Sequence, residues 1–315
     1  MAIGKSASFI MAVAAAFLAS AGPARADEPL FGYIYATDLL PKGQMEAEQW
    51  ATLREGRSQG EFHALQTRSE LSYGVEDDFQ LSGYLNFAWA DVSHNTPSGD
   101  TSPPEIFADY HADPTSRFEK GRFESVSIEA LYRFLSPYTD GIGMALYVEP
   151  SIGPRTIELE NRLIFQKNFF DDRLVLAANI TVGYEWRYLH GDPEADPLEA
   201  DFHDHWDKET DVNFGLAASY RIVSNWALGL ELQNEREWGG LDPFRPSQRT
   251  NVAWYLGPTV HYGGESFFFT LTTLAQLPMA HDFANSGADN FVVDGITNAD
   301  DFENLRVRLK VGFYF

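Results

Sequence analysis

Charged side chains recur at every second position in several stretches of this 315-residue chain. Glu158, Glu160 and Arg162, for example, alternate with apolar residues in 157–163. Successive side chains of a strand point to opposite faces, so this alternation places the charges on one face. Such rows could pair structurally or, if they oppose one another in a pore, select ions. The set comprises Glu46, Glu48, Arg68, Glu70, Glu129, Arg133, Glu149, Glu158, Glu160, Arg162, Glu185, Arg187, Glu231, Glu235, Arg306, Arg308 and Lys310.

Nucleophilic catalysis has little support in the sequence. Cysteine is absent, which excludes thiolate chemistry, Cys-ligated metals and disulfides. His63 and Ser69 share one face of an alternating stretch, but six residues of strand separate them by about 20 Å, too far for a hydrogen bond. We therefore expect that the protein is not an enzyme. A lipid-modifying enzyme, the alternative, would require a Ser–His pair within about 3 Å.

Further ligand-type side chains lie between residues 189 and 211. His190, His203 and His205 stand among many Asp and Glu residues there. Imidazoles and carboxylates bind divalent cations, yet their spacing is irregular and fits no known ligand pattern. We expect a solvated loop, with neither a dedicated metal site nor a cofactor. Metal binding by this loop is the open alternative.

The alternating stretches are the elements that would position these charges. Twelve can be recognised, each with one apolar and one polar face. The third is the clearest, because Phe79, Leu81, Leu85 and Phe87 alternate with polar or small residues. The twelve lie at about 44–54, 62–75, 79–89, 126–134, 144–152, 157–166, 174–187, 211–221, 226–237, 251–262, 266–277 and 303–315. Pro150 and Pro258 fall inside these stretches and predict local bulges or kinks.

The connections between the stretches alternate in length. Links after even-numbered stretches are short, such as Val223-Ser224-Asn225, whereas those after odd-numbered stretches are variable and often long. The longest are 92–122, 189–210, 239–250 and 278–302, and the acidic 92–122 is expected to be disordered. Short turns on one side and long loops on the other are typical of a transmembrane β-barrel with an even number of strands. A soluble sandwich has no reason to keep its long loops on one edge.

The N-terminus and the net charge fit the same interpretation. Residues 1–26 combine Lys5, an apolar stretch over 9–21 and the small-x-small site Ala24-Arg25-Ala26, the pattern of a cleaved signal peptide. About 13 apolar residues are too few for a helix to cross a hydrocarbon core of about 30 Å. Cleavage removes two basic residues and no acid, so the net charge falls from −23 to −25. This acidity disfavours nucleic acid as a partner and suits a cation-preferring pore or a surface that meets divalent cations.

The final stretch carries a resemblance to a known class. Six apolar residues alternate with polar or small ones up to the C-terminus: Leu305, Val307, Leu309, Val311, Phe313 and Phe315. A terminal Phe after such a pattern resembles the C-terminal signal of Gram-negative outer-membrane β-barrels. The resemblance implies that Phe313 and Phe315 form a signal read by the barrel assembly machinery.

A narrower resemblance lies near the predicted cleavage site. The sequence Tyr33-x-Tyr35-x-Thr37-Asp38-Leu39-Leu40-Pro41-Lys42-Gly43, followed by Glu46, Glu48, Gln49 and Trp50, resembles a family of uncharacterised proteobacterial barrels. It is also similar to the outer-membrane proteins named for the phenol-degradation meta pathway. This resemblance implies a barrel that passes small molecules.

Together these observations predict an all-β fold, a single transmembrane antiparallel up-and-down β-barrel of about 12 strands with both termini periplasmic. Ten or 14 strands are the alternatives. The expected organisation is a signal peptide over 1–26, a periplasmic lead-in segment over 27–42 that could plug the lumen, and a barrel over 43–315. The predicted location is the bacterial outer membrane.

The predicted function is that of a porin-like channel for passive passage of small solutes through a narrow charged lumen, in which the charged set lines the pore and contributes to selectivity. The alternative is a non-conducting structural or surface-binding barrel that acts through its long acidic loops. Expected partners are outer-membrane lipid, lipopolysaccharide (in part through divalent cations), the barrel assembly machinery and small solutes, but not nucleic acid.

Overall fold

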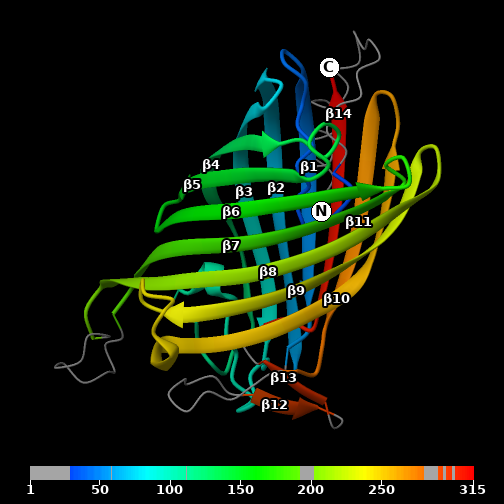
Figure 1. Cartoon of the computed structure of the whole chain (residues 1–315). Coiled ribbons are helices and arrows are strands. Elements are labelled where there is room, and N and C mark those ends of the chain that lie inside the picture. The colour runs from blue at the N-terminus through cyan, green and yellow to red at the C-terminus, as the bar shows by residue number, and fades with distance from the viewer. Residues whose placement is uncertain are drawn as a thin grey trace, which may run out of the picture.

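Twelve long strands form one closed antiparallel barrel among the described residues (Figure 1). The computed structural model describes residues 29–315 except 58, 111, 192–201, 280–289, 294–295 and 300–301. The predicted signal peptide therefore lies outside the described residues. Neighbouring strands pair around the ring in the order β1-β14-β11-β10-β9-β8-β7-β6-β5-β4-β3-β2. The barrel strands are β1 (Met45–Glu55), β2 (Glu61–Glu76), β3 (Phe79–Ser93), β4 (Phe118–Leu135), β5 (Gly143–Ile152), β6 (Thr156–Phe169), β7 (Leu174–Leu189), β8 (His205–Val223), β9 (Trp226–Gly239), β10 (Arg249–Gly263), β11 (Phe267–Gln276) and β14 (Leu305–Tyr314).

The fold prediction is confirmed, including twelve strands in the barrel and their antiparallel up-and-down order. The ring closes between the first and last strands, where Trp50 of β1 pairs with Lys310 of β14. The short connections gather at one end and the long ones at the other, where β12 (Asn290–Val293) and β13 (Ile296–Ala299) form a separate hairpin (Figure 1). None of the described helices is long and apolar enough to cross a membrane.

The outer wall of the barrel is apolar because alternate residues of each strand point outward. On β4, for instance, Val126, Ile128, Tyr132 and Phe134 are all exposed, whereas Ser127 and Glu129 between them are buried. A belt of exposed apolar side chains on a closed sheet is suited to lipid, since every strand edge is paired and no backbone group is left unsatisfied there.

The loop between β3 and β4 corrects one expectation. Instead of being disordered, it contains the 3₁₀ helix η2 (Glu105–Phe107) and packs apolar side chains against the barrel. Phe107 is fully buried and lies with its ring centre 5.6 Å from that of Phe118. The acidic composition suggested disorder, but a few aromatic residues bury enough apolar surface to order the loop.

The two prolines interrupt ladders without changing the register. Pro150 pairs with Leu159 of β6, and Pro258 pairs with Leu230 of β9. Pairing with the strand on the opposite side is interrupted at both positions, between Ser127 and Ala130 of β4 and between Thr272 and Ala275 of β11. Proline lacks the amide hydrogen needed on that second side. The predicted bulges are therefore local gaps in the ladder.

Candidate functional site

A segment that precedes the first strand runs through the barrel interior. We call residues 29–44 the lumen segment. Most of its apolar side chains are buried, including Leu30, Phe31, Ile34 and Leu40. Some of them pack against inward-facing residues of the wall, as Leu30, Phe31 and Ile34 do against Val175, Ala177 and Ala217. The lumen is therefore partly filled by the chain itself.

Polar side chains of the wall hold the backbone of the lumen segment. The buried carboxylate of Glu231 accepts hydrogen bonds from the amides of Gly32, Tyr33 and Ile34, at 2.7, 2.8 and 3.1 Å. Asn179 accepts from the Tyr35 amide at 2.7 Å and donates to the Tyr35 carbonyl at 2.9 Å. These bonds satisfy backbone groups that would otherwise be buried without partners. The segment is thus held by side chains rather than by a strand ladder.

The wall also provides space for the lumen segment. A Cβ atom added to Gly215 would lie 2.1 Å from Cδ1 of Ile34. One added to Gly143 would lie 2.2 Å from Oγ1 of Thr37. Side chains at these two inward positions would clash with the side chains of Ile34 and Thr37, so glycine leaves room for them.

An internal chamber of about 360 Å³ lies between the lumen segment and the end that carries the long loops. Its lining includes Tyr33 and Tyr35 of the lumen segment and Glu105 of η2. The charged residues that line it are Arg54, Arg57, Arg68, Glu105, Glu124, Glu158, Glu160, Arg162, Glu185, Arg187, Asp211, Glu235, Glu237, Glu303, Arg306 and Arg308. A volume of this size has room for about a dozen water molecules at about 30 Å³ each.

The two signs of charge are unevenly distributed around the chamber. Basic residues gather on and just after β14, β1 and β2: Arg54, Arg57, Arg68, Arg306 and Arg308. Acidic residues outnumber basic ones on β6, β7, β8 and β9, where Arg162 and Arg187 lie among Glu158, Glu160, Glu185, Asp211, Glu235 and Glu237. These two groups of strands lie on opposite sides of the ring. The arrangement produces an electric field across the chamber.

Several of the charges form ion pairs along or across the wall. Arg306 contacts Glu235 and Glu303. Arg162 pairs with Glu160 at 2.8 Å and lies over the Tyr35 ring at 4.3 Å. Burial raises the pKa of the Glu303 carboxyl, but the nearby guanidinium groups of Arg306 and Arg54 lower it by a larger amount. The resulting pKa is about 2. This part of the site therefore has a structural component.

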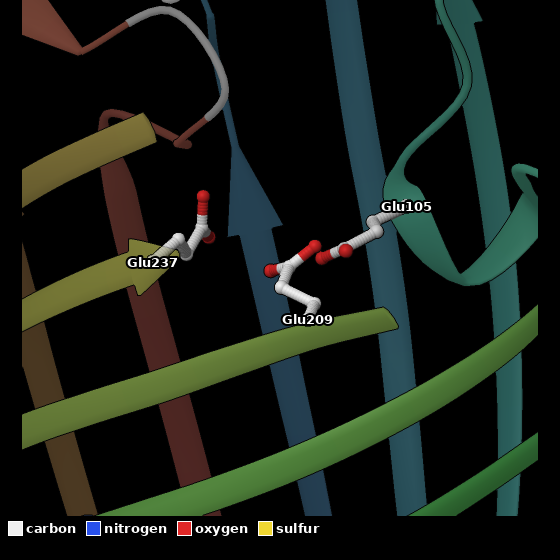
Figure 2. A group of neighbouring side chains, drawn as sticks. All are labelled: Glu105, Glu209 and Glu237. Carbon is white, nitrogen blue, oxygen red and sulfur yellow. The ribbon is translucent and has the colours of Figure 1, made fainter. Parts of the chain in front are cut away.

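Three carboxylates from separate elements meet beside the chamber (Figure 2). Glu105 of η2, Glu209 of β8 and Glu237 of β9 each place an oxygen within 4.8 Å of the others. Glu105 also contacts Arg187. Burial raises the pKa of the Glu105 carboxyl, but Arg187 and a hydrogen bond with Glu209 lower it more, so its pKa lies below the usual value.

The structure places all the predicted lumen residues at buried or half-buried positions. They do not, however, form one site. Glu46, Glu48, Glu70, Glu129 and Lys310 line a smaller pocket that also contacts the lumen segment. Arg133 donates to the carbonyl of Thr37 at 3.2 Å and also to that of Asp77, a residue of a short turn.

The remaining sequence predictions fall elsewhere. His63 contacts Glu55, and Ser69 donates to Gln49 at 2.6 Å, so these two side chains do not contact each other. In the acidic loop, His190 lies 3.5 Å from Asp204, while residues 192–201 are outside the described part of the chain. Metal binding by this loop stays an alternative prediction.

Sequence reasoning missed several residues that shape the interior. Asp211 is the first residue of the stretch predicted at 211–221, whereas β8 begins six residues earlier, at His205, so that Asp211 lies inside the strand. Arg54 is an even number of residues from Glu46 and Glu48 in β1 and therefore lies on the same inward face. The alternation of the strand could have identified it. No sequence pattern marks Glu105 as an interior residue, because only the folding of its loop brings it to Arg187 of the barrel wall.

Residues 23–315 match the family described as "Family of unknown function (DUF6662)". The chain belongs to this family. No curated protein matches the chain by sequence. Its confirmed β-barrel fold and apolar outer wall assign this DUF6662 member to the Gram-negative outer-membrane barrels, and its location is the bacterial outer membrane.

Solved structures with a similar fold include the COG4313 outer membrane channel from Pseudomonas putida F1, at 10% identity and a TM-score of 0.54, covering 89% of this chain and 98% of that one. The translocator domain of autotransporter NalP from Neisseria meningitidis is 11% identical with a TM-score of 0.49, covering 86% and 88%. The NanC porin is 12% identical with a TM-score of 0.45, covering 85% and 98%. At 10% identity, the similarity to the COG4313 channel shows the fold alone. The narrower resemblance to the meta-pathway proteins stays a prediction.

Proposed function

We propose that this DUF6662 protein is a channel for passive passage of small solutes through a narrow charged lumen, and that the lumen segment closes it at rest. The observation that carries the proposal is the chamber of about 360 Å³ in the barrel interior, bounded on one side by the lumen segment. A barrel whose role was only structural could fill this space with side chains, as eight-stranded barrels do. Passage through such a lumen requires no chemical reaction.

The contacts of the lumen segment support a gate. Its backbone hydrogen bonds run to the side chains of Glu231, Asn179, Gln166 and Gln80. Each hydrogen bond of this kind makes a net contribution to stability of about 0.5–1.5 kcal/mol, or about 1.5–3 kcal/mol where the partner is charged. Release of the segment would therefore leave the barrel ladders intact. The barrel wall is the stable element and the segment the movable one.

The orientation and partners follow from the same proposal. The end with short turns would face the periplasm, as would both termini, and the long acidic loops would face outward. There their carboxylates could be bridged by divalent cations to lipopolysaccharide phosphates. Phe313 and Phe315 would present the C-terminal signal to the barrel assembly machinery.

Planar-bilayer conductance tests the gate. We would compare the refolded chain from residue 27 with a variant lacking 29–40 and with Gly215→Leu, in which the new side chain occupies the position of Ile34. We expect rare or small openings from the parent chain and frequent stepwise openings from both variants. Gly83→Leu is the matched control, because nothing lies within 4 Å of a Cβ at Gly83.

The rival function is a non-conducting barrel that acts through its outer loops. It is favoured by the extent to which the lumen segment fills the interior. If folded, heat-modifiable barrels of both variants never conduct, the channel proposal is wrong and the rival stands.

A further inference from the structure

Arg308 of β14 is a basic group of the chamber without an acidic partner. No carboxylate among the described residues lies within ion-pair distance of it. Instead its Nε donates to Oγ1 of Thr52 at 2.8 Å and its Nη1 donates to the Gly32 carbonyl at 3.1 Å. Its guanidinium carbon lies 3.8 Å from the centre of the Tyr33 ring. These contacts fix the orientation of the cation but leave its charge uncompensated.

Glu158 of β6 and Asp211 of β8 show the opposite imbalance. Neither carboxylate forms a hydrogen bond or an ion pair with a described residue, although both line the same chamber as Arg308. Their neighbours are acidic as well, since Glu158 pairs with Glu185 and Asp211 with Glu237 in the strand register. The two arginines on this side of the chamber, Arg162 and Arg187, are paired with Glu160 and Glu185, so Glu158 and Asp211 are left without a cationic partner.

The unpaired charges face each other across the barrel. In the closed ring, β6 is the sixth strand from β14 whichever way the ring is followed, so Glu158 lies on the strand diametrically opposite Arg308. Uncompensated charges away from bulk water are costly, and structural ion pairs would normally remove them. Here the wall keeps a cation on one side and carboxylates on the other, with space between them.

We propose that the chamber binds a small zwitterion, whose anionic group contacts Arg308 and whose cationic group contacts Glu158 and Asp211. The proposal rests on the channel function above and names its solute class. A simple anion or cation would neutralise one wall while leaving the other unpaired, whereas a zwitterion compensates both. A dipolar solute is also oriented by the field across the chamber. The ring faces of Tyr33 and Trp50 lie beside Arg308 and can accommodate the methylene groups between the two charges.

Binding can be measured without conduction, which separates this proposal from the channel proposal. Trp50 lines the chamber and its ring centre lies 5.2 Å from the guanidinium carbon of Arg308, so tryptophan fluorescence and calorimetry can both report occupancy. The probes are an ω-amino acid series from glycine to 6-aminohexanoate, with hexanoate and hexylamine as singly charged controls. We expect at least one zwitterion of the series to bind at least tenfold more tightly than either control at neutral pH.

Charge-neutral variants assign the two ends of the ligand. Arg308→Gln should lower the affinity for the zwitterion at least tenfold without weakening hexylamine binding, and Arg308→Lys should restore part of it. Glu158→Gln combined with Asp211→Asn should lower zwitterion affinity to a similar degree without weakening hexanoate binding. The exposed residues Glu61 and Arg245 provide the matched controls, Glu61→Gln and Arg245→Gln.

Four outcomes test the two proposals. Zwitterion affinity equal to that of hexanoate or hexylamine overturns the proposal, as does unchanged affinity in folded variants of Arg308 and of the two carboxylates. Selective binding by a protein that never conducts would support the chamber site while refuting the channel. Conduction without selective binding would support the channel while refuting the chamber site. Heat-modifiable migration of each variant establishes that it is folded.

Discussion

At the scale of single residues, one carboxylate connects the barrel wall to the lumen segment. Glu231 is fully buried and accepts three backbone amides together with the hydroxyl of Thr272 at 2.8 Å. The other wall residues that contact the backbone of this segment, such as Asn179, Gln166 and Arg308, each bind only one or two backbone groups. Glu231 is therefore the residue whose loss should weaken docking most.

We expect Glu231→Gln to increase opening of the lumen segment about 10- to 100-fold. A hydrogen bond to a charged acceptor contributes about 1.5–3 kcal/mol, and about 1.4 kcal/mol corresponds to a factor of ten. The measurement is hydrogen exchange at the amides of Gly32, Tyr33 and Ile34. Asp78→Asn, in an exposed short turn, is the control. Unchanged exchange in a folded Glu231→Gln barrel would contradict this role.

A second residue-scale prediction concerns pH. The folded-state pKa of Glu303 is about 2, below its ordinary value of 4.5, so its ion pair with Arg306 contributes stability above about pH 4.5. That contribution declines as the pH falls and is lost as it passes through about 2. We therefore expect Glu303 to remain ionised between pH 7 and pH 4.

Carbon-13 NMR of the Glu303 carboxyl, assigned by comparison with Glu303→Gln, would test this expectation. A titration midpoint near 4.5 would mean that the pair with Arg306 does not persist in the membrane protein. A midpoint near 2 would show that mild acid does not release the connection between Glu303 and β14.

At the scale of elements, the gap in the β10–β11 ladder depends on a glycine. A Cβ added to Gly257 would lie 1.7 Å from the Thr273 carbonyl oxygen, closer than any real contact. Gly257 precedes Pro258, at which the ladder with β11 is interrupted. The two residues together allow the neighbouring strands to approach closely at a point where they do not pair.

We expect Gly257→Ala to destabilise the folded barrel by about 1–3 kcal/mol, because the added methyl group forces the two strands apart. Urea unfolding in detergent micelles measures the change. Gly83→Ala provides the control, since its new methyl group would meet no atom within 4 Å. Equal stability of the two variants would show that β10 and β11 can separate at this point without cost.

At the scale of the whole molecule, the surplus of acid in the chamber sets the expected ion preference. Nine acidic and seven basic side chains line it. We therefore expect the open channel to prefer cations, measured as the reversal potential in a salt gradient. Replacing both Glu158 and Glu160 with Gln leaves seven of each sign and should move the reversal potential close to zero.

The control for selectivity changes two acids that do not line the chamber. Glu61→Gln combined with Glu119→Gln removes the same charge from exposed positions near the end with long loops. We expect little change in reversal potential from this pair. An equal shift in both double variants would mean that the overall surface charge, rather than the chamber, governs selectivity.

The sequence by itself determined the architecture of this protein. Alternation within each stretch, such as Val126 to Phe134, separates the lipid-facing from the inward side, and alternating loop lengths set the direction of each strand. Both signals are local, so they can be read without knowing which residues meet. Parity also identified the inward charges, from Glu46 to Lys310, because a strand has a period of two.

Only the tertiary structure decided how these charges are grouped. Closure of the ring places Glu158 opposite Arg308, although parity alone assigns both simply to the inner wall. The docking of residues 29–44 onto Glu231, and of Glu105 beside Arg187, joins positions far apart in the chain. Such contacts depend on the size of the barrel and on the packing of irregular segments, for which the sequence has no periodic signal. The strands were therefore predictable from local patterns, whereas the chamber is a consequence of closure.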